Sequence, residues 1–261
     1  MRILLKLDDV RFEYDAGTPD AVTALDGFSA SISSGDLILL YGANGSGKST
    51  LLRLLEGSLL PTGGSLSVAG GPLHEAAKAA TRLHQAPLSN LAPSLTVYDH
   101  ICLALGQGML RLFHRSYSRV VLEKAIERAA QFSVGLDERM RSAVRRLSGG
   151  QQQALAILTA VAAHRSGLLL LDEPTASLDP NARRQVVQVI RTVCSSGTHS
   201  VVVATHDFSL LESLTARVWV LDEGRLTGDL GPGMGPELAS KVLRLVYGSQ
   251  LSSRADDPTK Q

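Results

Sequence analysis

The chain has 261 residues, of which 44% are hydrophobic and 20% are charged, and its formal net charge is +1. A chain of this length can bury an ample core without disulfides or a structural metal. The balance of its charges does not favour a nucleic acid as the main partner.

The cysteines and the apolar runs indicate a reducing compartment and no membrane insertion. Cys102 and Cys194 stand apart in apolar surroundings, which favours core positions over a disulfide or a metal site. The longest apolar run, 154–163, is well short of the roughly 20 residues that span a membrane. Lys6 and Asp8 interrupt the apolar start before a signal-peptide core could form, so we do not expect secretion.

The N-terminal part predicts an antiparallel β-layer. Short apolar runs at 3–7 and 10–14 are bounded by turn signals, and the run at 28–32 alternates with a period of two. A further strand is predicted at 65–68, between two pairs of glycines. Because a glycine-rich loop separates these β regions in the chain, we expect the β-layer to pack beside the core that carries this loop.

This glycine-rich loop fulfils the pattern G-x-x-x-x-G-K-[ST] at every fixed position. An apolar strand is predicted at 37–41 before it, and a helix begins near Lys48 and ends at Gly57. We expect the loop to bind a nucleoside triphosphate, with Lys48 at the β- and γ-phosphates and the hydroxyl of Ser49 on Mg²⁺. The predicted nucleotide-binding residues of the loop are Gly42, Ala43, Asn44, Gly45, Ser46, Gly47, Lys48, Ser49 and Thr50.

Between about 91 and 146 the pattern changes to helices. Thr96 and Asp99 predict a capping box, and apolar residues recur on one side of a helix predicted at about 119–132. The segment 111–115 is locally basic, which is more typical of a solvated connector than of a contact with anionic lipid or a membrane partner.

A second anion site is predicted where the run LSGGQ at 147–151 opens a helix. This helix is apolar on nearly all sides and must therefore be buried. Its N-terminus offers the hydroxyl of Ser148, free backbone amides and the helix dipole. Taken alone, Ser148 could equally be an ordinary N-cap.

The C-terminal half alternates helices with fully apolar strands, which indicates a mostly parallel sheet. Strands are predicted at 168–171 and 201–204, with a helix at about 186–193 between them. The first of these strands ends in Asp172, a predicted Mg²⁺ ligand. Glu173 follows it, and because the strand pleat turns it in another direction, we assign it as the general base that accepts a proton from the attacking water.

Together, the phosphate loop, the LSGGQ run and the two carboxylates resemble the nucleotide-binding subunits of ATP-binding cassette (ABC) transporters. The resemblance extends from about 7 to 228. It implies that the LSGGQ run at 147–151, the signature motif of this family, contacts the γ-phosphate held by a second copy of the chain. The active sites would then form only in a head-to-tail dimer. The residues implied in this contact are Ser148, Gly149, Gly150 and Gln151.

The resemblance also implies ligands for adenine and for the metal. Tyr14 matches the aromatic residue that stacks on adenine, with Phe12 as the alternative and simple core packing as a competitor for both. Gln85 matches the glutamine that senses the metal and the attacking water. The implied metal residues are therefore Ser49, Gln85 and Asp172.

Two further residues match positions near the γ-phosphate and the dimer interface. His206 follows the strand at 201–204 and matches the switch histidine that contacts the γ-phosphate and positions Glu173. Asp179 matches the D-loop, which crosses the dimer interface in this family. Because Asp179 precedes Pro180, it is equally suited to be an N-cap before the first residue of a helix, and both roles can hold.

The implied fold class is α/β, with a P-loop NTPase (RecA-like) parallel-sheet core, an antiparallel β-subdomain and a helical insertion subdomain. A single ABC ATPase domain is expected over 1–250. We expect the β-subdomain and phosphate-loop core over about 1–90, the helical subdomain over about 91–146, the rest of the core over about 147–230, a C-terminal helix over about 231–250 and a disordered tail over 251–261.

The implied function is hydrolysis of ATP with Mg²⁺, coupled to transport through integral membrane permease subunits. We expect the protein on the cytoplasmic face of the inner membrane, attached through the permease, with no nucleic acid partner. The other expected partners are a second copy or a related cassette subunit and, for an importer, a solute-binding protein. A bacterial importer of a small organic solute is the preferred interpretation.

Three alternatives remain beside it: the ATPase of an exporter, a non-transport ABC ATPase, and a module that binds ATP without hydrolysing it. The short segment between the phosphate loop and the signature disfavours DNA-repair members, which carry long insertions there. A single cassette disfavours ribosome-associated members, which join two. Glu173, Gln85, Ser148 and His206 disfavour a module without hydrolysis.

Overall fold

A six-stranded, mostly parallel sheet forms the centre of the chain. The computed structural model describes residues 3–68, 80–106, 123, 126–127, 129–132, 134–163 and 167–255. The strands of the central sheet are, in spatial order, β5 (Ala80–Leu83), β6 (Gly167–Asp172), β7 (His199–Ala204), β3 (Leu37–Tyr41), β8 (Ala216–Asp222) and β9 (Arg225–Gly233). All neighbours from β5 to β8 are parallel, and only β9 pairs antiparallel, at the edge. The expected α/β class is confirmed.

The strands at the centre are apolar throughout because both faces of the sheet are covered. On β3, Leu39 and Tyr41 face one core, whereas Ile38 and Leu40 face the other. The same alternation holds along β6 and β7, as expected from the two-residue period of a strand.

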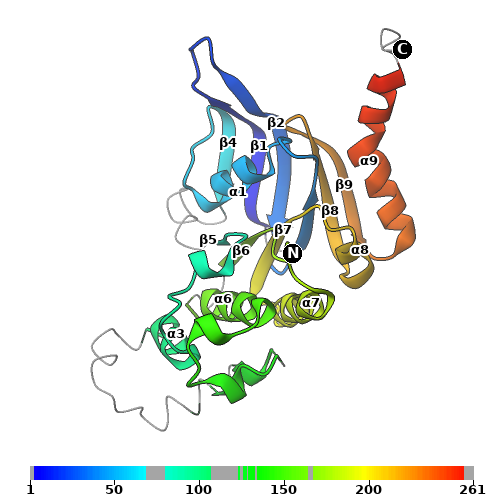
Figure 1. Ribbon diagram of the computed structural model, residues 1–261. Coiled ribbons are helices and arrows are strands. Elements are labelled where there is room, and N and C mark those ends of the chain that lie inside the picture. Colours follow the sequence, from blue (N-terminus) through cyan, green and yellow to red (C-terminus); the bar gives the residue numbers. More distant parts are fainter. Residues whose placement is uncertain are drawn as a thin grey trace.

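Helices cover one face of this sheet, and an antiparallel sheet with α1 covers the other (Figure 1). The helices are α1 (Lys48–Glu56), α3 (Val97–Ala104), α6 (Gly149–Ala163), α7 (Pro180–Ser195), α8 (Ser209–Ser213) and α9 (Pro236–Ala255), with 3-10 turns η1 (Pro87–Ser89), η2 (Asp137–Arg139) and η3 (Val144–Arg146). Side chains of α3, α6, α7 and α9 belong to the first core, and the leucines of α1 belong to the second. As predicted, the helix that follows LSGGQ is buried.

The predicted β-layer is a three-stranded antiparallel sheet in the order β2 (Val22–Ser33), β1 (Ile3–Tyr14) and β4 (Gly63–Val68). The two runs predicted at 3–7 and 10–14 form one strand. Its pairing with β2 shifts register between Leu7 and Val10, where Asp9 has a positive φ of 49°. A bulge of this kind lets one long strand continue where the apolar pattern is interrupted.

Several boundaries differ from the sequence-based expectation. The turn signals and charged residues at 216–233 did not suggest strands, yet β8 and β9 lie there. Helix α9 reaches Ala255, five residues beyond the expected end of the C-terminal helix at about 250. The rest of the expected tail and the basic segment 111–115 lie outside the described residues, whereas 123, 126–127 and 129–130 of the predicted helix at 119–132 are helical.

Local signals set the ends of several helices as predicted. Thr96 and Asp99 form the predicted capping box of α3, and Gly57 ends α1 in the left-handed conformation. None of the helices in the described ranges is long and apolar enough to cross a membrane.

Candidate nucleotide-binding and catalytic site

The glycine-rich loop connects the carboxyl end of β3 to the first residue of α1, Lys48. Gly45 and Gly47 have φ values of 82° and 104°, which side-chain-bearing residues rarely adopt. A Cβ atom on Gly42 would lie 2.3 Å from the carbonyl oxygen of Leu221, and one on Gly47 would lie 2.4 Å from that of Ala24. The close approach of neighbouring backbone therefore requires glycine at both ends of this turn.

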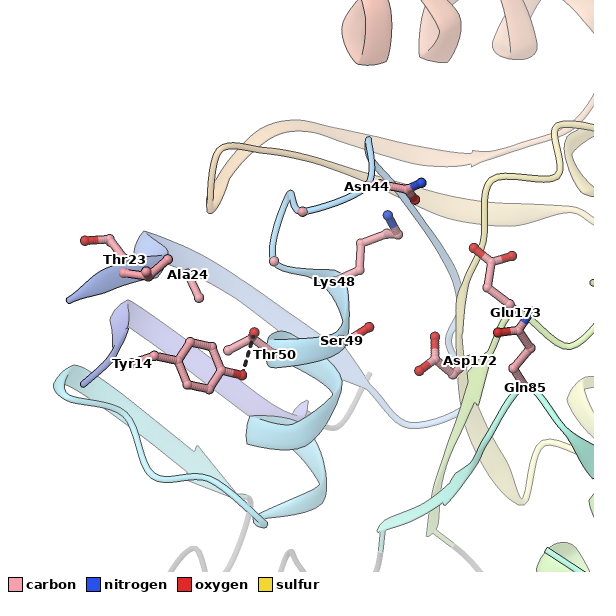
Figure 2. A pocket seen from close by; sticks show the side chains of 13 residues that line it. Tyr14, Thr23, Ala24, Asn44, Lys48, Ser49, Thr50, Gln85, Asp172 and Glu173 are labelled. Carbon is pink, nitrogen blue, oxygen red and sulfur yellow. Dashed lines mark hydrogen bonds between the residues drawn. The ribbon is translucent and has the colours of Figure 1, made fainter. Parts of the chain in front are cut away.

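Lys48 is held inside the loop. Its ammonium group donates hydrogen bonds to the carbonyl oxygens of Gly42, at 2.8 Å, and Ala43, at 2.9 Å. Burial lowers the pKa of Lys48, and the negative charges of Glu173 and Asp172 oppose this shift. The loop thus places a cation opposite two carboxylates, those of Asp172 at the end of β6 and of Glu173 after it, which Figure 2 shows facing it.

A cavity of about 440 Å³ opens along this loop. Its lining includes Tyr14, Val22, Thr23, Ala24, Asn44, Gly45, Gly47, Lys48, Ser49, Thr50, Gln85, Asp172 and Glu173 (Figure 2). Most of the predicted nucleotide-binding residues line it, as do the three predicted metal residues, Ser49, Gln85 and Asp172. Residues of β2 also contribute, which the sequence patterns did not indicate.

Of the two aromatic residues considered for adenine, Tyr14 lines the cavity. Its hydroxyl group lies 3.1 Å from that of Thr50 in the loop. Phe12 is only 8% exposed and packs in the second core, where its ring meets that of Tyr14 edge to face at 4.9 Å. The structure therefore favours Tyr14 and gives Phe12 a packing role.

Glu173 has an unusual backbone conformation and a defined set of neighbours. Its φ is 49°, and its backbone N–H donates to the carbonyl oxygen of Ala204, on β7, at 2.8 Å. The carboxylate lies 2.8 Å from Nδ1 of His206 and accepts a bond of 3.3 Å from the hydroxyl of Thr205. The structure thus brings the predicted base and the predicted switch histidine into direct contact.

His206 itself is open to solvent, with 66% of its side chain exposed. Because β7 lies beside β6, the residues that follow these two strands meet at one edge of the sheet. Gln85 follows β5, the neighbour of β6 on the other side. A second cavity, of about 410 Å³, is lined by Gln85, Glu173, His206 and residues of the loop that leads to Asp179.

The signature residues lie apart from the loop cavity. Ser148 and Gln151 hold each other at the start of α6, where the Ser148 hydroxyl accepts from the Gln151 N–H and the Gln151 side chain accepts from the Ser148 N–H, both at 3.3 Å. Ser148 and Gly149 are exposed, while Gly150 is buried, where a Cβ atom would lie 2.9 Å from the Cα of Ala182. The N-cap geometry considered for Ser148 is therefore present, and its hydroxyl remains accessible.

Asp179 caps α7 as predicted. Its carboxylate accepts from the backbone N–H groups of Asn181, at 2.8 Å, and Ala182, at 3.0 Å, and these bonds lower its pKa. Ser177, two residues earlier, has a positive φ of 59°. The segment before the cap is thus sharply turned and leaves Asp179 exposed.

Two elements of the site had no signal in the sequence analysis. Arg82, on β5, donates to Oδ2 of Asp172 at 2.6 Å. The hydroxyl of Tyr41 donates to the backbone carbonyl oxygen of Asp207 at 3.0 Å, and burial, together with the charges of Asp207 and Glu173, raises the pKa of Tyr41. The contact of Arg82 with Asp172 could be predicted only from the strand register, and the contact of Tyr41 with Asp207 only from the complete fold.

The available donors fit a hard divalent cation. The Ser49 hydroxyl, the Asp172 carboxylate and the Gln85 amide oxygen are the type of ligand that Mg²⁺ prefers. Within the described ranges, three or more His, Cys, Asp or Glu side chains do not cluster in a way that could hold a metal. This set therefore suits a cation that takes its other ligands from phosphates and water.

The ABC transporter family profile matches residues 25–176, more than half of the chain. The chain belongs to the ABC transporter family. Its relatives and structural neighbours identify it as a nucleotide-binding subunit of such a transporter. ATP binding and ATP hydrolysis are the activity of this family of ATPases.

The ABC subunit is 33% identical to the phosphonates import ATP-binding protein PhnC 1 of Rhodopseudomonas palustris (strain HaA2), over 97% of this chain and 90% of that protein. It is 32% identical to the cell division ATP-binding protein FtsE of Streptococcus pneumoniae (strain ATCC BAA-255 / R6), over 88% of this chain and 96% of that protein. Its fold is similar to that of cbiO1 from Clostridium perfringens, with a TM-score of 0.74 and 23% identity over 97% of this chain and 98% of that one.

Proposed function

We propose that the chain is the Mg²⁺-dependent, energy-coupling ATPase subunit of a bacterial ABC importer of a small organic solute. The observation that carries the catalytic part is the contact between Glu173 and His206 at the edge of the loop cavity. It supplies a carboxylate base with an orienting partner, beside a loop built to bind phosphates.

The residues of the chain divide the work in hydrolysis. Lys48 and the backbone N–H groups of the loop bind the β- and γ-phosphates. A bound Mg²⁺ ion, held by Ser49, Asp172 and Gln85, would neutralise charge on the phosphate oxygens. Glu173 accepts a proton from the water that attacks the γ-phosphate, while His206 and Thr205 hold its carboxylate.

The site is proposed to be completed by a second cassette. The hydroxyl of Ser148 is exposed, and in the described part of the chain neither it nor its signature neighbours line the loop cavity. A helix N-terminus with free N–H groups that faces outward can bind an anion held by another molecule. Binding of ATP would then join two subunits, and loss of the γ-phosphate would release them.

The importer assignment rests on the relative with the widest coverage of this chain reported above, whose name describes phosphonate import. Transport requires a permease, and we propose that this partner holds the subunit at the cytoplasmic face of the membrane. The cell division relative is almost as similar, and its name favours an ABC ATPase of cell division, rather than of solute import, as the second candidate function.

Replacement of Glu173 tests the proposal. Glu173→Gln keeps the shape of the side chain but removes the base, so we expect ATP hydrolysis to fall by about 10² to 10⁴-fold, while ATP binding persists and a dimer accumulates. Phosphate release and size-exclusion chromatography with ATP measure both effects. Glu237→Gln, an exposed change on α9, is the matched control and should behave as the native protein.

Normal turnover in Glu173→Gln would remove Glu173 from the role of general base. The ATP-trapped variant also serves as bait in membranes from the source cells. Recovery of a permease that binds a small organic solute supports the importer, whereas recovery of a membrane protein without transport activity supports the second candidate.

A further inference from the structure

A buried arginine pairs with the predicted metal ligand. The side chain of Arg82 is only 6% exposed, and its Nη2 atom lies 2.6 Å from Oδ2 of Asp172. Its Nη1 atom lies 3.9 Å from the carboxylate of Glu56, at the end of α1. Nε of Arg82 is buried and has no hydrogen-bond partner among the described residues.

The strand register produces this contact. Arg82 is paired with Leu170 on β6, and Asp172 lies two residues further along that strand. Residues two apart on a strand point to the same face, so an arginine is long enough to reach past Leu170 to the carboxylate. An uncharged residue at this position would leave Asp172 without this cationic partner.

We propose that Arg82 is an internal counter-ion of Asp172 that competes with the divalent cation for this carboxylate. This inference depends on the proposed role of Asp172 in holding the cation. With Oδ2 held by the guanidinium group, the cation must use the other oxygen of Asp172 or displace Arg82. Arg82 thereby sets how strongly the site binds its metal.

Arg82 has two opposing effects on cation binding: it fixes the orientation of the Asp172 carboxylate, and its positive charge repels the cation, and the second effect is the larger. Fixing one carboxylate rotamer is a small contribution, whereas a unit positive charge within several ångströms of a divalent cation repels it strongly, even with protein-like screening. Removing the charge of Arg82 should therefore tighten binding of a divalent cation by about tenfold or more.

The pair also protects the site when the cation is absent. The side chains of Asp172 and Glu56 are only 18% and 31% exposed, and half-buried carboxylates without a cation destabilise the folded state. Without Arg82, positive charge beside the carboxylates of Asp172 and Glu56 would come from Lys48 and from a bound divalent ion. Thermal stability should then depend on the divalent cation far more than it does in the native protein.

The test compares Arg82→Met with the native chain, using Mn²⁺ as the probe. We expect electron paramagnetic resonance titration in the presence of ADP to show about tenfold tighter Mn²⁺ binding in the variant. We also expect a lower unfolding temperature in EDTA that Mn²⁺ alone restores. Arg82→Lys keeps the charge and should bind Mn²⁺ as the native chain does. Arg191→Met is a second control, because native Arg191 lies on α7 and bonds the carbonyl oxygen of Ser213 on α8, and this variant should also bind Mn²⁺ as the native chain does.

Unchanged or weaker Mn²⁺ binding in Arg82→Met would overturn the proposal that Arg82 competes with the cation for the Asp172 carboxylate. Should that variant fail to fold, Arg82→Gln removes the charge, keeps a hydrogen-bond donor and gives the same two expectations. Asp172→Asn separates this inference from the proposed function. If it leaves Mn²⁺ binding unchanged, the metal role of Asp172 fails, whereas if it abolishes binding and Arg82→Met has no effect, only the role of Arg82 fails.

Discussion

Single residues at this site hold conformations that their neighbours enforce. Glu173 has a left-handed backbone, which costs a residue with a side chain about 1–2 kcal/mol. The bond from its N–H to Ala204 and the contacts of its carboxylate with His206 and Thr205 offset this cost. Strain of this kind, maintained by a surrounding sheet, is common where a catalytic group must face a substrate.

The glycines of the loop allow a matched test of close packing. Gly47 and Gly17 both have positive φ values, of 104° and 80°, but a Cβ atom would meet the carbonyl of Ala24 at 2.4 Å in the first case and no atom within 4 Å in the second. Gly17→Ala should therefore cost about 1 kcal/mol of stability through backbone strain alone. Gly47→Ala should cost more and should abolish ATP binding.

Denaturant unfolding, followed by the fluorescence of the single, fully buried Trp219, measures the stabilities, and a fluorescent ATP analogue measures binding. Equal stability losses in the two variants, with ATP binding retained in Gly47→Ala, would contradict the expected clash between a Cβ atom at position 47 and the neighbouring backbone.

At the scale of elements, the cap of α7 gives a prediction that depends on pH. The backbone N–H groups of Asn181 and Ala182 lower the pKa of Asp179 below its ordinary value of 3.8. The stability that the ionised cap supplies is therefore complete above that value and is lost as the pH falls through the lower pKa of the native state. Asp179→Ala should unfold at a lower temperature than the native chain at neutral pH, and this difference should shrink below pH 3.8.

Asp179→Asn is the control, because asparagine also caps helices but does not ionise in this range. Melting curves of both variants across acidic pH test the expectation. A difference between Asp179→Ala and the native chain that grows as the pH falls would contradict it.

The central strands β3, β6 and β7 could be predicted from the sequence, whereas β8 and the edge strands β5 and β9 could not. The run at 168–171 is uniformly apolar because both of its faces are covered. In β8, Arg217 interrupts the pattern, and its partners come from other strands and loops: it forms ion pairs with Asp229 on β9 and with Asp36, and it donates to the carbonyl oxygen of Ser31 on β2. A charged residue inside a strand can be explained only by its neighbours on adjacent strands, and the sequence alone does not show which strands are adjacent.

The same distinction applies to the candidate site. The contact between Glu173 and His206 follows from two strands that end side by side, and it could be anticipated from the order of the motifs. The pair of Arg82 and Asp172 depends on the register of β5 against β6, because a shift by one residue would turn Arg82 to the other face. No local sequence signal sets that register.

At the scale of the whole molecule, the two layers place the parts of the cavity. The antiparallel sheet packs on the second core through β1 and β2, which brings Tyr14 and Ala24 to the loop. The opposite layer carries the start of α6, with Ser148 exposed. One chain therefore presents a phosphate-binding loop and a second anion-binding helix end that do not share a cavity.

A mixture of two inactive variants tests most directly whether these two parts act on one ATP from different chains. Lys48→Ala removes the loop cation, and Ser148→Arg blocks the outward-facing helix end, so each variant alone should lack ATP hydrolysis. In an equal mixture, half of the dimers pair one variant with the other and hold one intact composite site, which predicts recovery of about a quarter of the native rate of phosphate release if the sites turn over independently. Phosphate release from the mixture that equals the average of the two separate variants would contradict a shared site.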